Sequence, residues 1–190
     1  MIKSASILLM TIFLVNGVHS VTQAEHIDKI LKNLKINPEV LWWSPKLFAN
    51  VTFPSGASAH LGNGIKLADV QQKPQVNWPC HEKKLYTMIF TDIDYLIDTV
   101  PIVREYQAWF VHDIPGDDIE KGKEVLEYYP PEFLKQGPHR IVVTVFQQVR
   151  PINITKTPFP GQQRHKFCVF DIMWVFNGYL HAVNLYFVEP

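Results

Sequence analysis

Two aspartates and a histidine are the residues of this sequence best placed to do chemistry. Asp92 and Asp94 stand two positions apart where an apolar run ends, and His139 begins a later apolar run. Such carboxylates can take part in acid–base chemistry or bind a cation, and a histidine adds a donor and, below its pKa, a positive charge. The spacing is equally typical of an Asx turn, and a histidine at the start of a buried strand is commonly structural. The residue types alone leave both interpretations open.

Proline-set turns precede the histidine. Pro130 and Pro131 are adjacent, and a Gly-Pro pair at 137–138 comes directly before His139. Rigid turns can present backbone amides to an anion at little entropic cost. A histidine beside such turns would add a further donor, and Asp92 would then orient the histidine or the turn amides, because a carboxylate repels an anion.

The motifs of common enzymes are missing from the sequence. It has no G-x-S-x-G nucleophile elbow, no H-E-x-x-H, no P-loop and no dinucleotide fingerprint. No nucleophile is evidently placed to act with Asp92 and His139 as a hydrolase, and the two cysteines lack metal-ligand spacing. We therefore expect a non-catalytic binding protein without a cofactor or a metal.

The elements that must position these residues are mostly strands. Runs rich in β-branched and aromatic residues are separated by turn clusters, which predicts strands at 75–78, 84–91, 107–114, 139–148 and 178–188. Amphipathic periodicity predicts a helix at 25–36, and a second helix is expected at 164–176. Several strands with few helices favour a mainly β sandwich or barrel.

The N-terminus is typical of a secretory signal. Lys3 precedes an apolar run at 5–15, and small residues fit a cut after Ser20. The run is about half the ~20 residues that a transmembrane helix needs, so we expect no membrane anchor. The formal net charge of +0 leaves no basic surface for nucleic acid. These features predict export to the extracellular space.

Two further patterns agree with export. Asn50 and Asn153 each begin an Asn-x-Thr triplet, which is the acceptor for N-glycosylation. Cys80 and Cys168 are the only cysteines, and in an oxidising compartment an even count favours one disulfide. Two separate buried thiols are the alternative for this pair.

The order of several motifs resembles the phosphatidylethanolamine-binding protein (PEBP) family, which includes the Raf kinase inhibitor proteins. The family pattern D-P-D-x-P, R-E-W-x-H, G-P-P and G-x-H-R-Y-V-x-x-x-Y-x-Q has counterparts at 92–96, 104–108, 129–131 and 137–148. Shorter segments at 54–56, 61–63 and 76–78 are similar to the family's P-S-G, L-G-N and V-x-W. The resemblance covers roughly 45–187, and its most specific piece is the G-x-H-R strand with its trailing glutamine.

The resemblance implies a fold and a domain organisation. The expected fold is a PEBP-like β-sandwich of Greek-key type with a few short peripheral helices. We predict a signal peptide at 1–20, a helical and extended lead-in at 21–44 and a PEBP-like domain at 45–190.

The resemblance also implies a small pocket at one end of the sheet, which in relatives binds phosphate or the phosphoethanolamine head group. Matching positions assign Asp92, Asp94, Pro130, Pro131 and His139 to the pocket.

The chain departs from the family pattern in several pocket positions. Those that lose a proline, a histidine or a tyrosine of the family pattern are Ile93, Leu96, Val103, Ala108 and Ile141. The losses remove anion donors and add apolar surface, which favours an amphipathic ligand over bare phosphate.

Two functions follow from these observations. The first is a secreted, monomeric binding protein for a small anionic or amphipathic ligand, such as a phospholipid head group. The alternative is an extracellular interaction or inhibitor protein with a degenerate pocket, acting on a protein partner such as a serine protease or as an immune factor.

Overall fold

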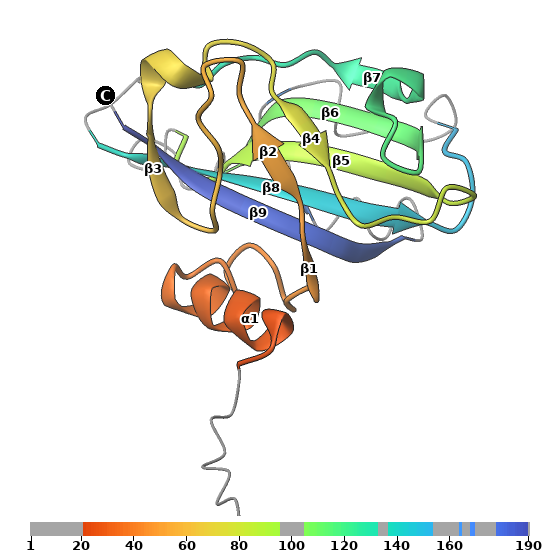
Figure 1. Ribbon diagram of the computed structural model, residues 1–190, viewed down its shortest axis with the longest axis horizontal. Helices are drawn as coiled ribbons and strands as arrows, with labels where there is room; N and C mark the ends of the chain where they lie inside the picture. The colour runs from red at the N-terminus through yellow and green to blue at the C-terminus, as the bar shows by residue number, and fades with distance from the viewer. Residues whose placement is uncertain are drawn as a thin grey trace, which may run out of the picture.

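The computed structural model describes residues 21–95, 105–132, 137–153, 164, 168–169 and 178–189. The expected signal segment at 1–20 and most of the expected helix at 164–176 lie outside the described residues. The described elements form a mainly β protein (Figure 1). The boundary after residue 44 stays a prediction.

The largest element of the described part is a twisted, open sheet. Its strand order is β1-β9-β8-β5-β6-β7, and β3 also pairs with β9. All neighbours are antiparallel except β1 and β3, which run parallel to β9. The strands are β1 (Leu47–Phe48), β3 (Asn63–Lys66), β5 (Leu85–Asp92), β6 (Tyr106–Pro115), β7 (Lys123–Leu126), β8 (His139–Gln148) and β9 (Tyr179–Glu189).

A second, smaller sheet covers one face of the main sheet. Here β2 (Asn50–Thr52) pairs antiparallel with β4 (Gln75–Asn77). Val51 and Val76, the middle residues of the two strands, point inward and join a core cluster with Met88 and Trp109 of the main sheet. The two layers are visible in Figure 1, where β2 and β4 cross in front of the larger strands.

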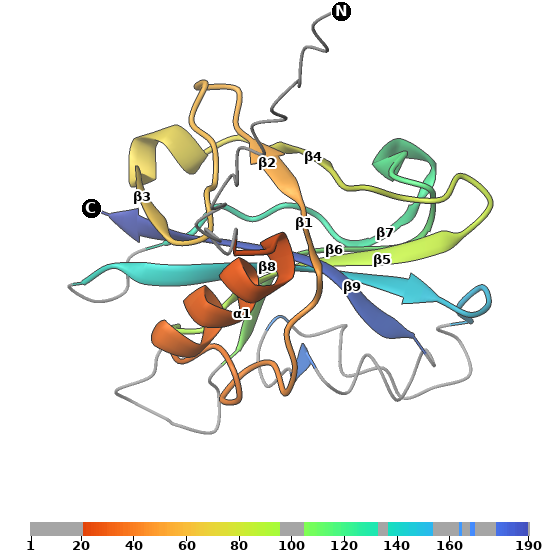
Figure 2. The same cartoon turned by 60° about the horizontal axis from the view of Figure 1, so that its bottom comes forward.

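The other face of the main sheet is covered by the lead-in. Helix α1 (Gln23–Asn33) begins at a capping box, in which Thr22 and Glu25 satisfy each other's backbone amides. Ile27 and Leu31 of α1 pack in a second core cluster that includes Val142 of β8. Figure 2 shows α1 lying across β8 and β9 on this face.

Coverage on both faces explains the apolar character of the central strands. In β8, Ile141, Val143 and Val145 lie in one core cluster and Val142 and Phe146 in the other, and both faces of the strand are almost wholly buried. The prediction of a mainly β, PEBP-like fold with few helices is confirmed; short 3₁₀ turns at Leu67–Val70 and Ile119–Lys121 complete the described elements. The described residues include no helix long and apolar enough to cross a membrane.

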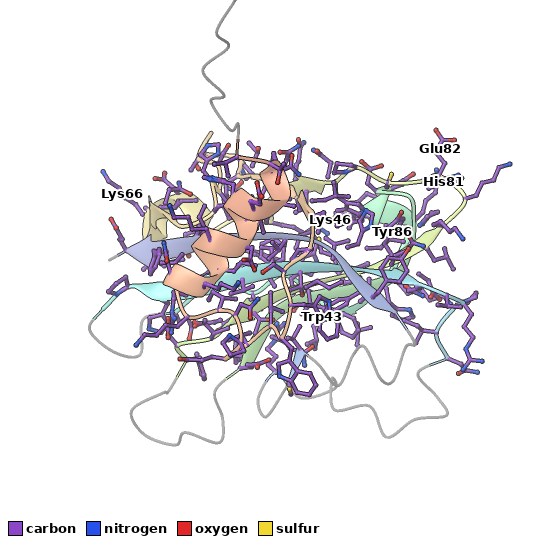
Figure 3. The ribbon with its side chains drawn as sticks, turned by 90° about the horizontal axis from the view of Figure 1, so that it is seen from below. Trp43, Lys46, Lys66, His81, Glu82 and Tyr86 are labelled. Carbon is purple, nitrogen blue, oxygen red and sulfur yellow. The ribbon has the colours of Figure 1, made fainter. Side chains whose placement is uncertain are left out.

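The expected disulfide is absent from the structure, where Cys80 and Cys168 are separate residues without a bridge. Cys80 is exposed in the turn before β5, beside Glu82, and this turn projects from one end of the molecule (Figure 3). Cys168 instead packs against the core cluster on the α1 face of the sheet. The even count of cysteines was therefore misleading, because a bridge requires Cα atoms within about 7 Å and the fold sends the two residues to different surroundings.

Candidate functional site: a small cavity at one end of the main sheet

The end of the main sheet where β5 finishes and β8 begins carries a small cavity. Its volume is about 80 Å³. The strands β5, β6 and β8 each contribute a wall residue there, because Asp92 pairs with Tyr106 on one side and with Ile141 on the other. The lining consists of Asp92, Tyr95, Tyr106, Ala108, Tyr129, Pro131, Glu132 and Ile141. We call this space the strand-end pocket.

Asp92 lines this pocket and forms a buried pair with His139, which is not itself a lining residue. The His139 Nδ1 lies 2.7 Å from the Asp92 Oδ2, and the two residues are 6% and 2% exposed. The hydrogen bond to Asp92 raises the pKa of His139 above its ordinary value, against the opposing effect of burial. The other oxygen of Asp92 accepts a hydrogen bond from the Asp94 amide at 2.9 Å. The Asx-turn interpretation and the oriented-histidine interpretation are thus both realised by one side chain.

Asp94 is directed to an arginine. Its two carboxylate oxygens accept hydrogen bonds from the Arg140 Nε at 2.8 Å and Nη2 at 2.6 Å, and the Arg140 amide donates a third at 2.9 Å. The Arg140 Nη1 also donates to the Leu34 carbonyl oxygen at 2.8 Å. This bidentate pair ties the turn after β5 to the start of β8 and to the end of α1. Asp94 is not one of the lining residues of the strand-end pocket. Its contacts with Arg140 instead hold together the segments that surround the pocket, which we call the frame of the pocket.

Three tyrosines surround the pocket, and none of them was among the predicted site residues. The rings of Tyr95 and Tyr106 stack at a centroid distance of 4.4 Å, and Tyr129 meets Tyr106 edge-on at 6.3 Å. Burial raises the pKa of Tyr106 to about 12, so its hydroxyl stays protonated at neutral pH and can donate. A usable signal existed in the sequence: Tyr95 directly follows the paired aspartates, and Tyr106 stands at the tryptophan of R-E-W.

A cation and an acid complete the surroundings of Tyr129. The Arg164 guanidinium lies over the Tyr129 ring at 5.2 Å and donates to the Gln107 and Ala108 carbonyl oxygens at 3.1 Å. The Tyr129 hydroxyl donates to Glu132, and that hydrogen bond raises the pKa of the tyrosine. Glu132 is a second acid on the pocket wall, which no family motif had indicated.

Of the positions that depart from the family pattern, two lie in the pocket wall. Ala108 and Ile141 line the strand-end pocket, so the lost histidine and tyrosine leave small or apolar walls. Ile93 points away and is buried in the core cluster on the α1 face. Leu96 and Val103 lie outside the described residues. Among the predicted prolines, Pro131 is a lining residue and Pro130 is not.

The chemistry of the pocket follows from its size and its groups. A volume of about 80 Å³ admits a few heavy atoms, far less than the ~300–1,000 Å³ of sites that enclose whole small molecules. Carboxylates and phenols supply acceptors and donors, and Ala108 and Ile141 supply an apolar wall. The described residues contain no cluster of three or more side chains that could hold a metal ion.

The two predicted glycosylation sites are exposed. Asn50 lies within β2, where its Nδ2 donates to the Asn77 Oδ1 at 2.9 Å. Asn153 lies in the segment after β8, and its Thr155 falls outside the described residues. Both sites stay predictions.

The chain is similar in sequence to proteins of animals and plants. It is 23% identical over 150 residues to a candidate odorant-binding protein, A5, of Drosophila melanogaster, covering 78% of this chain and 71% of that protein. It is 29% identical over 119 residues to a 26 kDa secreted antigen of Toxocara canis, covering 62% and 45% of the two chains. It is 32% identical over 110 residues to the CENTRORADIALIS-like protein of Arabidopsis thaliana, covering 57% and 62%.

Solved structures agree on the fold. A carboxypeptidase Y inhibitor, solved in complex with its cognate proteinase, superposes with a TM-score of 0.79 at 19% identity, covering 90% of this chain and 98% of the inhibitor. The phosphatidylethanolamine-binding protein of Plasmodium vivax superposes with a TM-score of 0.69 at 22% identity, covering 85% and 96%. No family model matches the chain. The structural neighbours are PEBP-family proteins and the sequence relatives include PEBP-like proteins, so the resemblance is confirmed: this chain is a divergent protein with the PEBP fold.

Proposed function

We propose that this chain is a secreted, non-catalytic binding protein that holds the small polar head of an amphipathic ligand in the strand-end pocket. The single observation that carries the proposal is that Asp92, which is paired with the buried His139, lines a cavity with an apolar wall. A paired histidine and carboxylate are costly to bury, and their place beside a cavity gives them a ligand to orient.

The size and charge of the pocket select the ligand. Because only a few heavy atoms fit, the remainder of any larger ligand lies outside the cavity. Asp92 and Glu132 both line the wall and disfavour a doubly charged anion such as inorganic phosphate, whereas phenols can donate to a singly charged phosphate diester or to an uncharged carboxyl group. An amphipathic molecule with a small polar head therefore suits this pocket better than inorganic phosphate does.

Export is supported by the N-terminal pattern and by similarity to a secreted antigen of Toxocara canis. The similarity to a candidate odorant-binding protein of Drosophila melanogaster is consistent with a small ligand. Neither relative identifies the ligand of this chain.

The test is a titration of the mature chain, residues 21–190, with inorganic phosphate, phosphoethanolamine, lysophosphatidylethanolamine and a long-chain fatty acid. We expect saturable binding of an amphiphile, tighter than that of inorganic phosphate, measured by calorimetry and by tryptophan fluorescence. His139→Ala should weaken it by roughly tenfold. The matched control is His81→Ala, which removes an exposed histidine in the turn before β5. Absence of binding by all four probes to folded protein would refute the proposal.

A second candidate, protease inhibition, is favoured by one observation. The carboxypeptidase Y inhibitor in complex with its proteinase superposes over 90% of this chain. If the chain is an inhibitor, it slows a carboxypeptidase or a serine protease at stoichiometric concentrations, and His139→Ala leaves that inhibition unchanged. A protease panel assayed with both variants separates this function from ligand binding.

A further inference from the structure

A larger cavity lies away from the strand-end pocket. Its volume is about 530 Å³. Its lining residues come from α1, β1, β2, β4, β9 and the segment after β2. Figure 2 shows the chain passing from α1 through β1, the edge strand of the main sheet, to β2. We call this cavity the edge cleft, bounded by Gln23 and His26 of α1, Phe48 of β1, Asn50 of β2 and Asn77 of β4.

A row of uncharged polar groups forms one wall of the edge cleft. In β2 the alternation of a strand turns Asn50 and Thr52 outward while Val51 is buried. The facing segment repeats the pattern, with Ser58 and His60 on either side of a buried residue. The Ser58 hydroxyl donates to the Thr52 hydroxyl at 3.3 Å, which links the two segments.

The floor of the cleft is held by a buried amide. Asn184, on β9 and 1% exposed, donates from its Nδ2 to the Ala49 carbonyl oxygen at 2.6 Å and to the Ala59 carbonyl oxygen at 3.1 Å. Its Oδ1 accepts from the Leu61 amide at 3.0 Å. One side chain thus fixes both segments that carry the polar row, so the wall is formed before any ligand arrives.

The lining of the edge cleft selects a neutral ligand. None of its described lining residues is an aspartate, glutamate, lysine or arginine. A charged ligand would lose hydration there without gaining an ionic partner, which is unfavourable. Amides, hydroxyls and imidazoles offer both donors and acceptors. Phe48, which is 37% exposed, adds a flat apolar surface beside them.

We propose that the edge cleft binds a short neutral saccharide. A sugar ring presents hydroxyl groups that both donate and accept, and it carries an apolar C–H face that packs on an aromatic ring. These are the two surfaces that the polar row and Phe48 provide. The cleft volume lies within the range of about 300–1,000 Å³ that is typical of small-molecule sites. The site is independent of the strand-end pocket and of the function proposed for it.

The saccharide can come from two sources with the same chemistry. One is a free or partner-borne sugar. The other is this chain's own N-linked glycan, because the Nδ2 of Asn50, the atom to which such a glycan is attached, lies in the cleft wall. A glycosylated amide keeps one N–H, so the hydrogen bond from Asn50 to Asn77 can persist. The innermost sugars of that glycan would then lie along the cleft.

The first arm of the test uses mature protein made without glycosylation. Di-N-acetylchitobiose, which is also the core of N-linked glycans, is titrated by calorimetry and by ligand-observed NMR. We expect saturable binding that His60→Ala and Phe48→Ala each weaken by about tenfold. Matched controls outside the cleft are His81→Ala and His139→Ala, which should leave this binding unchanged. Unfolding temperatures verify that each variant is folded.

The second arm uses protein secreted from a glycosylating host. If Asn50 carries the glycan that fills the cleft, an endoglycosidase should release it at least about tenfold faster from His60→Ala than from the parent protein or from His81→Ala. If chitobiose does not bind in the first arm, but the glycan of the parent protein is protected from the endoglycosidase in the second, the cleft is occupied by the chain's own glycan. Overturning results are absence of chitobiose binding together with absence of protection, or chitobiose binding that His139→Ala abolishes and His60→Ala leaves intact.

Discussion

The two ends of the main sheet carry similar residues in different surroundings. At one end Asp92 pairs with His139, the first residue of β8. At the other end Asp113 of β6 lies beside His112, with 3.3 Å between the His112 Nδ1 and the Asp113 Oδ1, and contacts Gln148, the last residue of β8. Both aspartates are at most 9% exposed, and both ends belong to the strand that carried the most specific motif.

The difference between the ends lies in what fills the space around the carboxylate. The Asp113 Oδ1 accepts from the Gln148 Nε2 at 2.7 Å and from the Ile152 amide at 2.9 Å, and its Oδ2 pairs with the Lys123 Nζ at 2.9 Å. Gln148 in turn accepts from Thr87 at 2.9 Å. Protein groups thus occupy the hydrogen-bonding capacity of Asp113, whereas Asp92 faces the strand-end pocket. A buried Asp–His pair identifies a binding site only where a cavity accompanies it.

We call the Asp113 end of the sheet the closed end, because protein groups fill it, and the Asp92 end the open end. The largest effect that tests this comparison is on stability at the closed end. Asp113→Ala should lower the free energy of unfolding by about 3 kcal/mol, because Gln148, Ile152 and Lys123 lose their shared acceptor. Urea denaturation measures the change, and ligand affinity in the strand-end pocket should stay as it was. Asp118→Ala, which removes an exposed acid paired with Lys121, is the control and should cost less than about 0.5 kcal/mol. An Asp113→Ala cost as small as this would contradict a structural role.

Acid should weaken the closed end selectively. Burial alone would raise the pKa of Asp113, but the hydrogen bonds from Gln148, Ile152 and Lys123, together with the neighbouring His112, outweigh it and lower the pKa to about 2. A lowered carboxyl pKa stabilises the fold above the ordinary value of 3.8, and the contribution is lost as pH falls through about 2. We expect about 1–2 kcal/mol of stability to disappear over that range. Urea curves of the parent and of Asp113→Asn, measured across it, should converge; parallel curves would contradict the prediction.

The open end should respond to pH in the opposite direction. Because the pKa of His139 is raised above 6.5, its charged pair with Asp92 stabilises the fold below that value and the contribution is lost as pH rises through the higher, folded-state pKa. The destabilisation caused by His139→Ala should therefore be about 1 kcal/mol larger near pH 5.5 than near pH 8.5. Chemical denaturation at both pH values measures it. A pH-independent difference would mean that His139 does not become charged beside Asp92.

The smallest effect concerns the frame of the open end. Arg140→Lys keeps the charge but loses the bidentate fork to Asp94, so stability should fall by about 0.5–1 kcal/mol. Ligand affinity should fall slightly with it, because the turn that carries Asp92 loosens. Arg150→Lys, at an exposed position after β8, is the matched control. If the two substitutions had equal effects on thermal unfolding, Asp94 would have no special role in holding the frame.

Much of the fold was predictable from local patterns. The expected strands at 84–91, 107–114 and 139–148 coincide with β5, β6 and β8 to within one residue at each end. The reason is that the alternation and the β-branched content that favour a strand are properties of neighbouring residues in the sequence. The helix expected at 25–36 is present as α1, which begins at Gln23 after the Thr22 cap and ends three residues earlier than expected, at Asn33.

The candidate site was predictable only in part. Asp92 and His139 were assigned from motif order, and the structure joins them at 2.7 Å. Glu132 was not assigned, because no local rule says that residues so distant in sequence will share one wall. The cysteines show that the count of a residue type does not say which residues the fold brings together. An even count predicted a bridge between two residues that the fold places in different surroundings.

The sequence by itself determined the long strands, the amphipathic helix, the family resemblance and the candidate pocket residues Asp92 and His139, but not the short strands β3 and β7. The features that it determined depend on residue type and spacing along the chain. The tertiary structure alone decided that Asp94 is engaged by Arg140, that tyrosines surround Asp92 and that Asn184 forms the floor of the edge cleft. The physical reason is that hydrogen bonds and cavities depend on contacts between distant segments, which exist only after the sheet has brought those segments together.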